Sequence, residues 1–483
     1  DSRQYLILII NTLKVQKTMK IFKNFIGLAA MALCLSFASC GSDDDAPSYS
    51  NAAVSNSELM TILKAKGYQF DENGKMLLDD KANSTTSLDL SGTKVDTAAL
   101  KELSVFPNLK ELNLSSNGYG PVFHIASLPS QITGLDLQGN DIYDFDGLVT
   151  AKVENDEVKA TILHEFTKLY LPASCKYNVE DLMPFYTQNE SENKTVDMQM
   201  VNDKGSLEKY NTLREIPDEY FRAYLKTKFA SLFADDTHID ISKPMDLVSK
   251  GEDIYIGFDN SFADADKVKS YAGVEYFINN PYYDPFAVTV NNLSDNCSIS
   301  YIAPRKNIVA LGLCNISTLP QIDLSQATNL VNMSLERNSN IESLDLTNTL
   351  IANQKIKDFD VRWGNGLNCL SCSNLKEIKL PKSEIGITGI IFLYDLPSLK
   401  EMDLSGIKAI SELNLLKLAD TSIIYPNLQY VLKSDNTLED ISNSSETINL
   451  AISEDVFNTE SAKAFITKYR DNLDDDYRAY KRY

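Results

Sequence analysis

Histidine, cysteine and tryptophan, on which many catalytic and metal sites depend, are scarce in this sequence. Its 483 residues include three histidines, seven cysteines and one tryptophan. His164 opens a pattern typical of zinc-protease helices, but Lys168 stands where the second zinc ligand is required. Motifs for a nucleophilic serine, a phosphate-binding loop or a dinucleotide site are also missing. We therefore expect no cofactor, no bound metal and no enzymatic activity.

The cysteines do not match a zinc site or a complete disulfide framework. Cys369 and Cys372 form a CxxC pair, but no second pair or nearby histidine completes four zinc ligands. Three more cysteines follow Cys40, namely Cys175, Cys297 and Cys314, so that five follow it in all. An odd number cannot all be joined in disulfides within the chain. We interpret one or both of Cys369 and Cys372 as replacements for leucines in a hydrophobic core.

Positive charge is also in short supply. The formal net charge is -21, and the first 39 residues carry a surplus of +4, which leaves -25 on the rest of the chain. A strongly negative surface repels phosphate backbones and anionic lipid heads. Nucleic acid is therefore not an expected partner, and the charge gives no reason to expect a direct contact with a membrane surface.

An export signal is predicted over residues 19–39, beginning at Met19. Two lysines precede an apolar run from Phe25 to Phe37, which is shorter than the roughly 20 residues that a membrane-spanning helix needs. The signal is thus expected to target the chain for secretion and to be removed. Residues 1–18 lie before this start, and we interpret them as an upstream-translated extension.

The end of the signal resembles the lipobox of bacterial lipoproteins. Small residues at 38 and 39 precede Cys40, and the acidic stretch Gly41–Asp45 is similar to the export tag of Bacteroidetes surface lipoproteins. The resemblance implies that Cys40 carries a lipid and becomes the N-terminus. The alternative is an ordinary cysteine beside a plain cleavage site. Residues 40–56 are polar and acidic, and we expect a solvated tether there.

Three segments downstream share one pattern. They are Leu88-Asp89-Leu90, Leu112-Asn113-Leu114 and Leu135-Asp136-Leu137, with first leucines 24 and 23 residues apart. This spacing matches the period of about 20–29 residues of leucine-rich repeats, and the segments resemble those repeats in Bacteroidetes surface proteins. The resemblance implies an α/β fold, a leucine-rich repeat solenoid, in which each unit points leucines into a core shared with its neighbours.

Two repeat arrays are expected, each preceded by a short capping helix. The N-terminal module, residues 57–205, begins with a helix near Leu59 and Leu63, with Ser55 or Ser57 as its cap. The C-terminal module, residues 206–483, begins with a helix near Ile216-Pro217 and closes with one near Phe465, behind Asn458 and Thr459 as candidate caps. Its strand cores are predicted at Ile322, Met333, Leu344, Phe359, Ile378, Met402 and Leu413. The first steps of 11 residues suggest two extended segments in each turn of the chain.

Residues between the core leucines are expected to face outward on the concave sheet. They are Asp89, Asn113, Asp136, Asp323, Asp345, Asp360 and Asp403. Such residues keep a sheet soluble, or alternatively bind a basic protein or a hydroxyl-rich glycan. Flat aromatic side chains beside polar groups suit sugars and protein hot spots, although burial in an irregular loop is the alternative. The candidate binding residues are Asp345, Asp360, Arg362, Trp363, Tyr282 and Tyr283.

These features predict a lipid-anchored outer-membrane protein, exposed at the cell surface, that recognises a macromolecule. The expected partner is a protein or a glycan, and the lipid is the one expected contact with the membrane. One alternative is a glycan-binding accessory lipoprotein of polysaccharide uptake, which needs an exposed aromatic platform. An extracellular hydrolase would need two carboxylates at a fixed separation, and a structural envelope protein would need neither.

Overall fold

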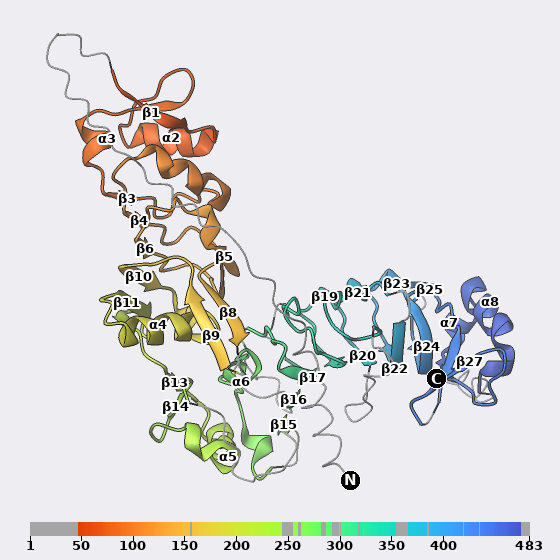
Figure 1. Ribbon diagram of the computed structural model, residues 1–483. Helices are drawn as coiled ribbons and strands as arrows, with labels where there is room; N and C mark the ends of the chain where they lie inside the picture. Colours follow the sequence, from red (N-terminus) through yellow and green to blue (C-terminus); the bar gives the residue numbers. More distant parts are fainter. Residues whose placement is uncertain are drawn as a thin grey trace, which may run out of the picture. The chain divides into compact units, whose positions relative to one another are not determined.

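The computed structural model describes residues 47–154, 157–243, 255–258, 262–281, 286–291, 299, 301–316, 319, 321–353, 366–383, 386–418, 420–433 and 435–474. Residues Ser48–Tyr483 belong to one compact unit. The fold is mixed α/β, with many strands in parallel sheets and few helices (Figure 1). Within these ranges, no helix has the length and apolar character needed to cross a membrane.

Six strands form the first sheet. Five are parallel and lie side by side in the order β3 (Ser87–Asp89), β4 (Glu111–Asn113), β6 (Gly134–Asp136), β10 (Lys168–Leu171) and β11 (Asp197–Val201) (Figure 1). The sixth, β12 (Leu207–Lys209), pairs antiparallel with β11. One buried residue of each parallel strand shares a register, and these are Leu88, Leu112, Leu135, Leu169 and Met198. The three leucine-containing segments of the sequence therefore lie on adjacent strands, as the spacing predicts.

Buried asparagines join successive turns of the chain. The Asn117 side-chain amide donates to the carbonyls of Leu90 and Leu114 at 3.1 and 2.9 Å. Asn140 donates in the same way to Leu114 and Leu137, and its Oδ1 accepts from the Asn117 backbone N–H at 3.0 Å. Backbone groups that the bends leave without a partner are thus satisfied by side chains.

Insertions explain why the sequence period slips after residue 150. A hairpin of β8 (Val149–Glu154) and β9 (Glu157–Ile162) separates β6 from β10, and helix α4 (Leu182–Ser191) separates β10 from β11. Two further strands, β11 and β12, follow β10 in the same sheet. The first sheet ends at Lys209, and the division into modules 57–205 and 206–483 stays a prediction.

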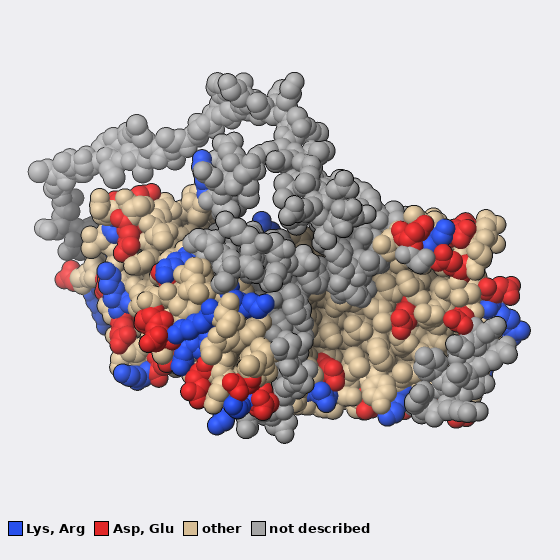
Figure 2. Space-filling view, turned by 90° about the horizontal axis from the view of Figure 1, so that it is seen from below, with Lys and Arg blue, Asp and Glu red and all other residues tan. Residues whose placement is uncertain are grey.

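The second sheet contains eight parallel strands. Their order is β15 (Tyr255–Phe258), β16 (Phe286–Asn291), β17 (Ile308–Cys314), β18 (Asn332–Glu336), β20 (Gly366–Leu370), β22 (Gly386–Tyr394), β24 (Ile407–Leu416) and β28 (Asn449–Ile452). On the outward face of the later strands lie several half-buried apolar side chains, Leu370, Ile390, Phe392, Tyr394 and Leu416. In Figure 2, the middle of the right-hand part of the face is mostly uncharged, and charged side chains lie toward its margins.

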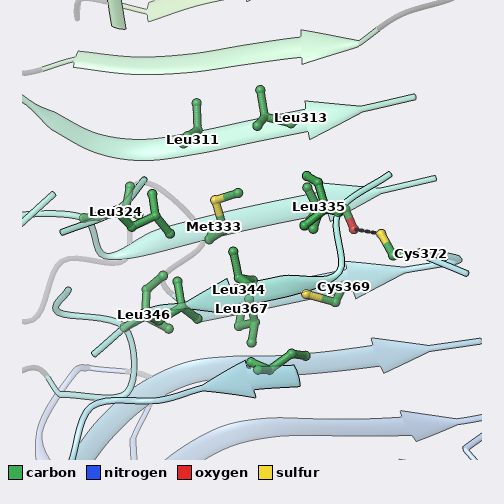
Figure 3. Packing of buried hydrophobic residues seen from close by; sticks show 14 of the residues in the cluster. Leu311, Leu313, Leu324, Met333, Leu335, Leu344, Leu346, Leu367, Cys369 and Cys372 are labelled. Atoms are coloured by element: carbon green, nitrogen blue, oxygen red, sulfur yellow. Dashed lines mark hydrogen bonds between the residues drawn. The ribbon is translucent and has the colours of Figure 1, made fainter. Parts of the chain in front are cut away.

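The inward face of the second sheet carries two rows of buried apolar residues (Figure 3). One row includes Leu311, Met333, Leu367, Ile391 and Leu413, and the other includes Leu313, Leu335, Cys369, Leu393 and Leu415. Cys369 therefore occupies a leucine position, as interpreted from the sequence. Cys372 is also buried in this core, beyond the end of the strand, and its thiol lies 3.5 Å from the Leu335 carbonyl.

A second row of short parallel strands lies in the same part of the chain. Strand β19 (Ser343–Asp345) pairs with β21 (Glu377–Lys379), and β23 (Glu401–Asp403) pairs with β25 (Ser422–Ile424). Met333 thus lies in the second sheet, and Leu344, 11 residues later, lies in this second row. The expectation that all outward aspartates share one sheet is wrong, because Asp345 and Asp403 belong to this second row. The core predicted at Phe359 lies outside the described residues.

Helices occur at the three predicted places. They are α2 (Ser57–Ala65), α5 (Glu219–Phe229) and α8 (Glu460–Lys468). Thr459 caps α8 as predicted, but Asn56 caps α2 through a 2.9 Å bond from the Leu59 N–H. Ser55 donates to Glu102 instead, which explains why it is not the cap.

Short elements complete the described fold. The strands among them are β1 (Tyr49–Ala53), β2 (Lys75–Leu77), β5 (Val122–His124), β7 (Asp144–Asp146), β13 (Leu213–Glu215), β14 (His238–Asp240), β26 (Tyr430–Leu432) and β27 (Leu438–Asp440). The helices are α3 (Asp80–Ser84), α6 (Glu275–Ile278) and α7 (Glu454–Phe457). Strand β1 falls within the predicted tether and corrects its extent, because Ser50 is buried and accepts a hydrogen bond from Met76 of β2.

Buried polar groups join the part of the chain that carries the first sheet to the part that carries the second. Asp144 in β7 accepts from Arg305 at 2.8 Å and from the Tyr301 hydroxyl at 2.5 Å. Arg305 Nε also lies 2.8 Å from Glu180 Oε2, an ion pair without hydrogen-bond geometry. The Tyr143 ring stacks on Tyr301 with centroids 4.2 Å apart. We call this group of five residues the junction.

Asp181 lies beside the junction and is itself buried. Its carboxylate accepts from the Asn178 amide at 2.9 Å and from the Phe145 backbone N–H at 3.2 Å. Burial, followed by the nearby negative charge of Asp144, raises the pKa of Asp181 to about 7, although the bond from Asn178 opposes this. Protonation of Asp181 near neutral pH therefore changes the charge next to the junction.

Candidate functional site

The outward face of the first sheet is a polar surface built by its parallel strands. Its side chains alternate with the buried leucines, because successive residues of a strand point to opposite faces. One row contains Asp89, Asn113, Asp136, Tyr170 and Gln199. The neighbouring row contains Ser87, Glu111, Gly134, Lys168 and Asp197. Apart from the buried Gly134, these residues are exposed or half-buried.

Tyr170 lies near the middle of this face, held by a hydrogen bond. Its hydroxyl donates to Asp197 Oδ2 at 2.7 Å, and Gln199 Nε2 donates to the other oxygen at 2.7 Å. The bond to Asp197, ahead of burial, raises the pKa of Tyr170 to about 12. Bonds from Gln199 and Tyr170 lower the pKa of Asp197. At neutral pH the site therefore presents a neutral phenol beside an ionised carboxylate.

Lys168 crosses the sheet beside this tyrosine. Its ammonium lies 3.1 Å from Glu111 Oε2 and 4.9 Å from the centre of the Tyr170 ring. Glu111 and Lys168 flank Gly134 in register, and a Cβ at Gly134 would lie 2.6 Å from Glu111 Cγ. Because Gly134 has no side chain, Glu111 and Lys168 can reach each other across it and form their ion pair. We call Glu111, Lys168, Tyr170, Asp197 and Gln199 the Tyr170 surface.

The Tyr170 surface combines one flat ring with charged and amide groups of fixed orientation. Such a ring presents an apolar face, while its neighbours offer hydrogen-bond acceptors and one cation. A phenol whose pKa is about 12 remains protonated at neutral pH and is a poor general base. Across the part of the chain that the structure describes, no group of three histidine, cysteine, aspartate or glutamate residues could hold a metal ion.

The repeated aspartates of the sequence have a local structural role. Six of the outward aspartate and asparagine residues accept a hydrogen bond through a side-chain oxygen. The donor is the backbone N–H two residues later, at 2.9 to 3.1 Å. The residues that accept are Asp89, Asn113, Asp136, Asp323, Asp345 and Asp403. Each one therefore stabilises the turn that follows its strand.

Of the predicted binding residues, the structure describes one. Asp345 is exposed and accepts from both the N–H and the hydroxyl of Thr347. Partial burial acts to raise the pKa of Asp345, but the bonds from Thr347 and the charge of Lys379 outweigh it, and the pKa lies below its usual range. Cys40 and the remaining candidates lie outside the described residues, and these are Tyr282, Tyr283, Asp360, Arg362 and Trp363.

The sequence pattern could have indicated Tyr170 but not its partner. Tyr170 follows Leu169 as Asp89 follows Leu88, so an extension of the repeat pattern places it on the outward face. Asp197 starts a strand with Met198 at the leucine position, after an inserted helix. Nothing in that segment marks the register that brings the two side chains together.

Comparisons with known proteins add no relative. No family model, no curated protein and no solved structure matches this chain.

Proposed function

We propose that this chain is a leucine-rich repeat solenoid with two arrays and capping helices, and that it binds a macromolecule through the Tyr170 surface. The observation that carries the proposal is the matched register of the first sheet, which places five interacting polar and aromatic side chains on one open face. Aromatic residues flanked by charged groups are typical of the strongest contacts in protein interfaces. A protein partner is therefore the favoured ligand of this surface.

The repeat assignment has support in both sheets. Consecutive strands of each sheet carry leucines at matched positions, and buried asparagines connect the turns of the first. In a solenoid each unit contacts its neighbours, so outward residues of successive strands form one continuous surface. That geometry suits recognition of an extended ligand.

Replacing Tyr170 with alanine is expected to weaken partner binding by about 30-fold or more, since loss of a central interface aromatic costs about 2 kcal/mol or more. The partner would be captured from host and bacterial surface extracts on immobilised residues 48–483 and then titrated against each variant. Tyr49→Ala is the matched control, because Tyr49 is an exposed tyrosine on β1. Equal affinity for wild type and Tyr170→Ala, with the fold intact, would refute the proposed surface.

We also propose that Cys40 anchors the chain in the outer membrane through a lipid. The support is the small-residue segment before Cys40 and the acidic stretch after it. Cys40→Ala is expected to move the full chain from the membrane fraction to the soluble fraction, whereas Cys34→Ala, within the apolar run, leaves it membrane-bound. Cell fractionation with immunoblotting measures this. A Cys40→Ala protein that stays wholly in the membrane fraction rules out the anchor.

A further inference from the structure

A groove of about 830 Å³ opens where the row of short strands is interrupted. Strand β21 pairs with β19 and β23 pairs with β25, and among the described residues no strand pairing connects β21 to β23. Residues of two segments, 376–383 and 400–408, line the space between them. The groove therefore lies at the interruption between β21 and β23.

This groove gathers several lysines on an acidic protein. Five lysines line it against three carboxylates, and a fourth carboxylate, Glu342, is paired with Lys376 at 2.7 Å, which leaves a local net charge of +1 on a chain whose net charge is -21. The lysines are Lys376, Lys379, Lys382, Lys400 and Lys408, and the carboxylates are Glu377, Glu401 and Asp403. A cluster of one sign raises the local concentration of ligands of the opposite sign.

Two of these lysines are not used by the fold. Lys382 and Lys400 are exposed, and their ammonium groups form no hydrogen bond or ion pair with the residues that the structure describes. By contrast, Lys379 lies 3.0 Å from Glu377, and Lys408 donates to the Ser405 carbonyl at 2.9 Å. The ammonium groups of Lys382 and Lys400 are thus free to bind an anion.

The rest of the lining selects among anionic ligands. Glu377 and Glu401 accept hydrogen bonds but repel phosphates and carboxylates, so a densely charged nucleic acid or acidic peptide fits poorly. Leu380, which is half-buried, supplies an apolar contact in the same groove, and the buried Ile378 and Ile407 form its base. The groove thus offers free lysines, carboxylate acceptors and apolar surface. A ligand that matches them carries anionic groups, many hydroxyl donors and apolar ring faces.

We infer that this groove binds an acidic saccharide, a carbohydrate chain whose units bear carboxylate or sulfate groups. Lys382 and Lys400 pair with its anionic groups, while the groove carboxylates accept from its hydroxyls. The site lies on a different sheet region from the Tyr170 surface and goes beyond the proposed function. It gives the chain a second ligand of different chemistry.

Affinity electrophoresis of residues 48–483 tests the inference. The gels contain chondroitin sulfate, polygalacturonic acid or, as the neutral polymer, dextran. Lys382→Glu/Lys400→Glu is expected to bind the acidic polymers at least about tenfold more weakly than wild type, because like charges then face each other. The control Lys101→Glu/Lys110→Glu alters two exposed lysines of the first half and changes the net charge equally. It is expected to bind as wild type does.

Retardation of the wild type by an acidic polymer, lost in the groove variant alone, supports the site. If both double variants lose the same amount of retardation, overall charge governs binding, and the inferred groove site is overturned. Equal retardation by dextran, or none by any acidic polymer, would also overturn it. Tyr170→Ala is expected to keep its acidic-polymer affinity, so failure of the groove and failure of the Tyr170 surface give different results.

Discussion

Replacing Arg305 with methionine is expected to lower the free energy of unfolding by about 3–5 kcal/mol. Arg305 and Asp144 are 7% and 8% exposed, and their 2.8 Å contact joins residues 161 positions apart in the chain. Methionine keeps much of the apolar volume but leaves the Asp144 carboxylate buried without its cation. The remaining bonds from Tyr301 and Asn178 do not neutralise that charge. Urea-induced unfolding at pH 7, followed by circular dichroism, measures the loss.

An exposed ion pair provides the control for this prediction. Lys463 lies 3.3 Å from Glu460 within α8, and their side chains are 49% and 94% exposed. Lys463→Met is expected to change the free energy of unfolding by less than about 1 kcal/mol, since water screens such pairs. Similar small losses in both variants would show that the junction does not stabilise the fold through its buried charges.

Stability is expected to fall as the pH rises from about 4 to 8, because of Asp181. Its pKa is about 7 in the folded chain, against an ordinary value of 3.8. Between these values the folded state holds a proton that the unfolded state has lost, so rising pH favours unfolding. At 1.36 kcal/mol for each pKa unit, this one group changes the free energy of unfolding by roughly 4 kcal/mol.

The variant Asp181→Asn isolates that contribution. Asparagine keeps the shape of the side chain, and its carbonyl oxygen can still accept from Asn178 and Phe145. Other titrating groups cancel when the unfolding free energy of the wild type is subtracted from that of the variant at each pH. This difference is expected to grow in favour of the variant from pH 4 to pH 8. Parallel curves for the two proteins would contradict the raised pKa of Asp181.

The sequence contained enough information to predict the core of the first sheet. Leucines repeated at steps of 24 and 23 residues force the segments into one register, since another register would expose them. Helices α5 and α8 were also predictable, because Asp218 and Thr459 precede amphipathic segments and cap them. Local patterns of this kind depend on neighbours within a few turns of the chain.

Features that depend on distant residues were not predictable. The segments at Met333 and Leu344 have the same apolar alternation, yet one belongs to the second sheet and the other to the short row. Alternation shows that a strand is half-buried but does not show which sheet it joins. The contacts of Asp144 with Tyr301 and Arg305 likewise connect segments that share no motif. The groove between β21 and β23 arises from an interruption of pairing, which composition does not reveal.

Aspartate in the repeats illustrates how one pattern supports two interpretations. Outward acidic residues were expected either to keep the sheet soluble or to bind a ligand. The described ones form turns, as Asp345 does with Thr347 at 3.0 Å. A short side chain that accepts from the N–H two residues on is favoured wherever the chain bends after a strand. Their repetition therefore follows from the repeated bend, and ligand binding is not needed to explain it.

Site-specific photo-crosslinking tests the central claim, recognition through the first sheet, most directly. A benzophenone side chain would replace Asn113, an outward residue of β4, or Ile424, which is 45% exposed on β25. Intact cells displaying each variant would be irradiated with the partner bound. The account predicts a protein adduct from position 113 and none from position 424. An adduct from position 424 alone, or none at position 113 while the partner remains bound, would contradict it.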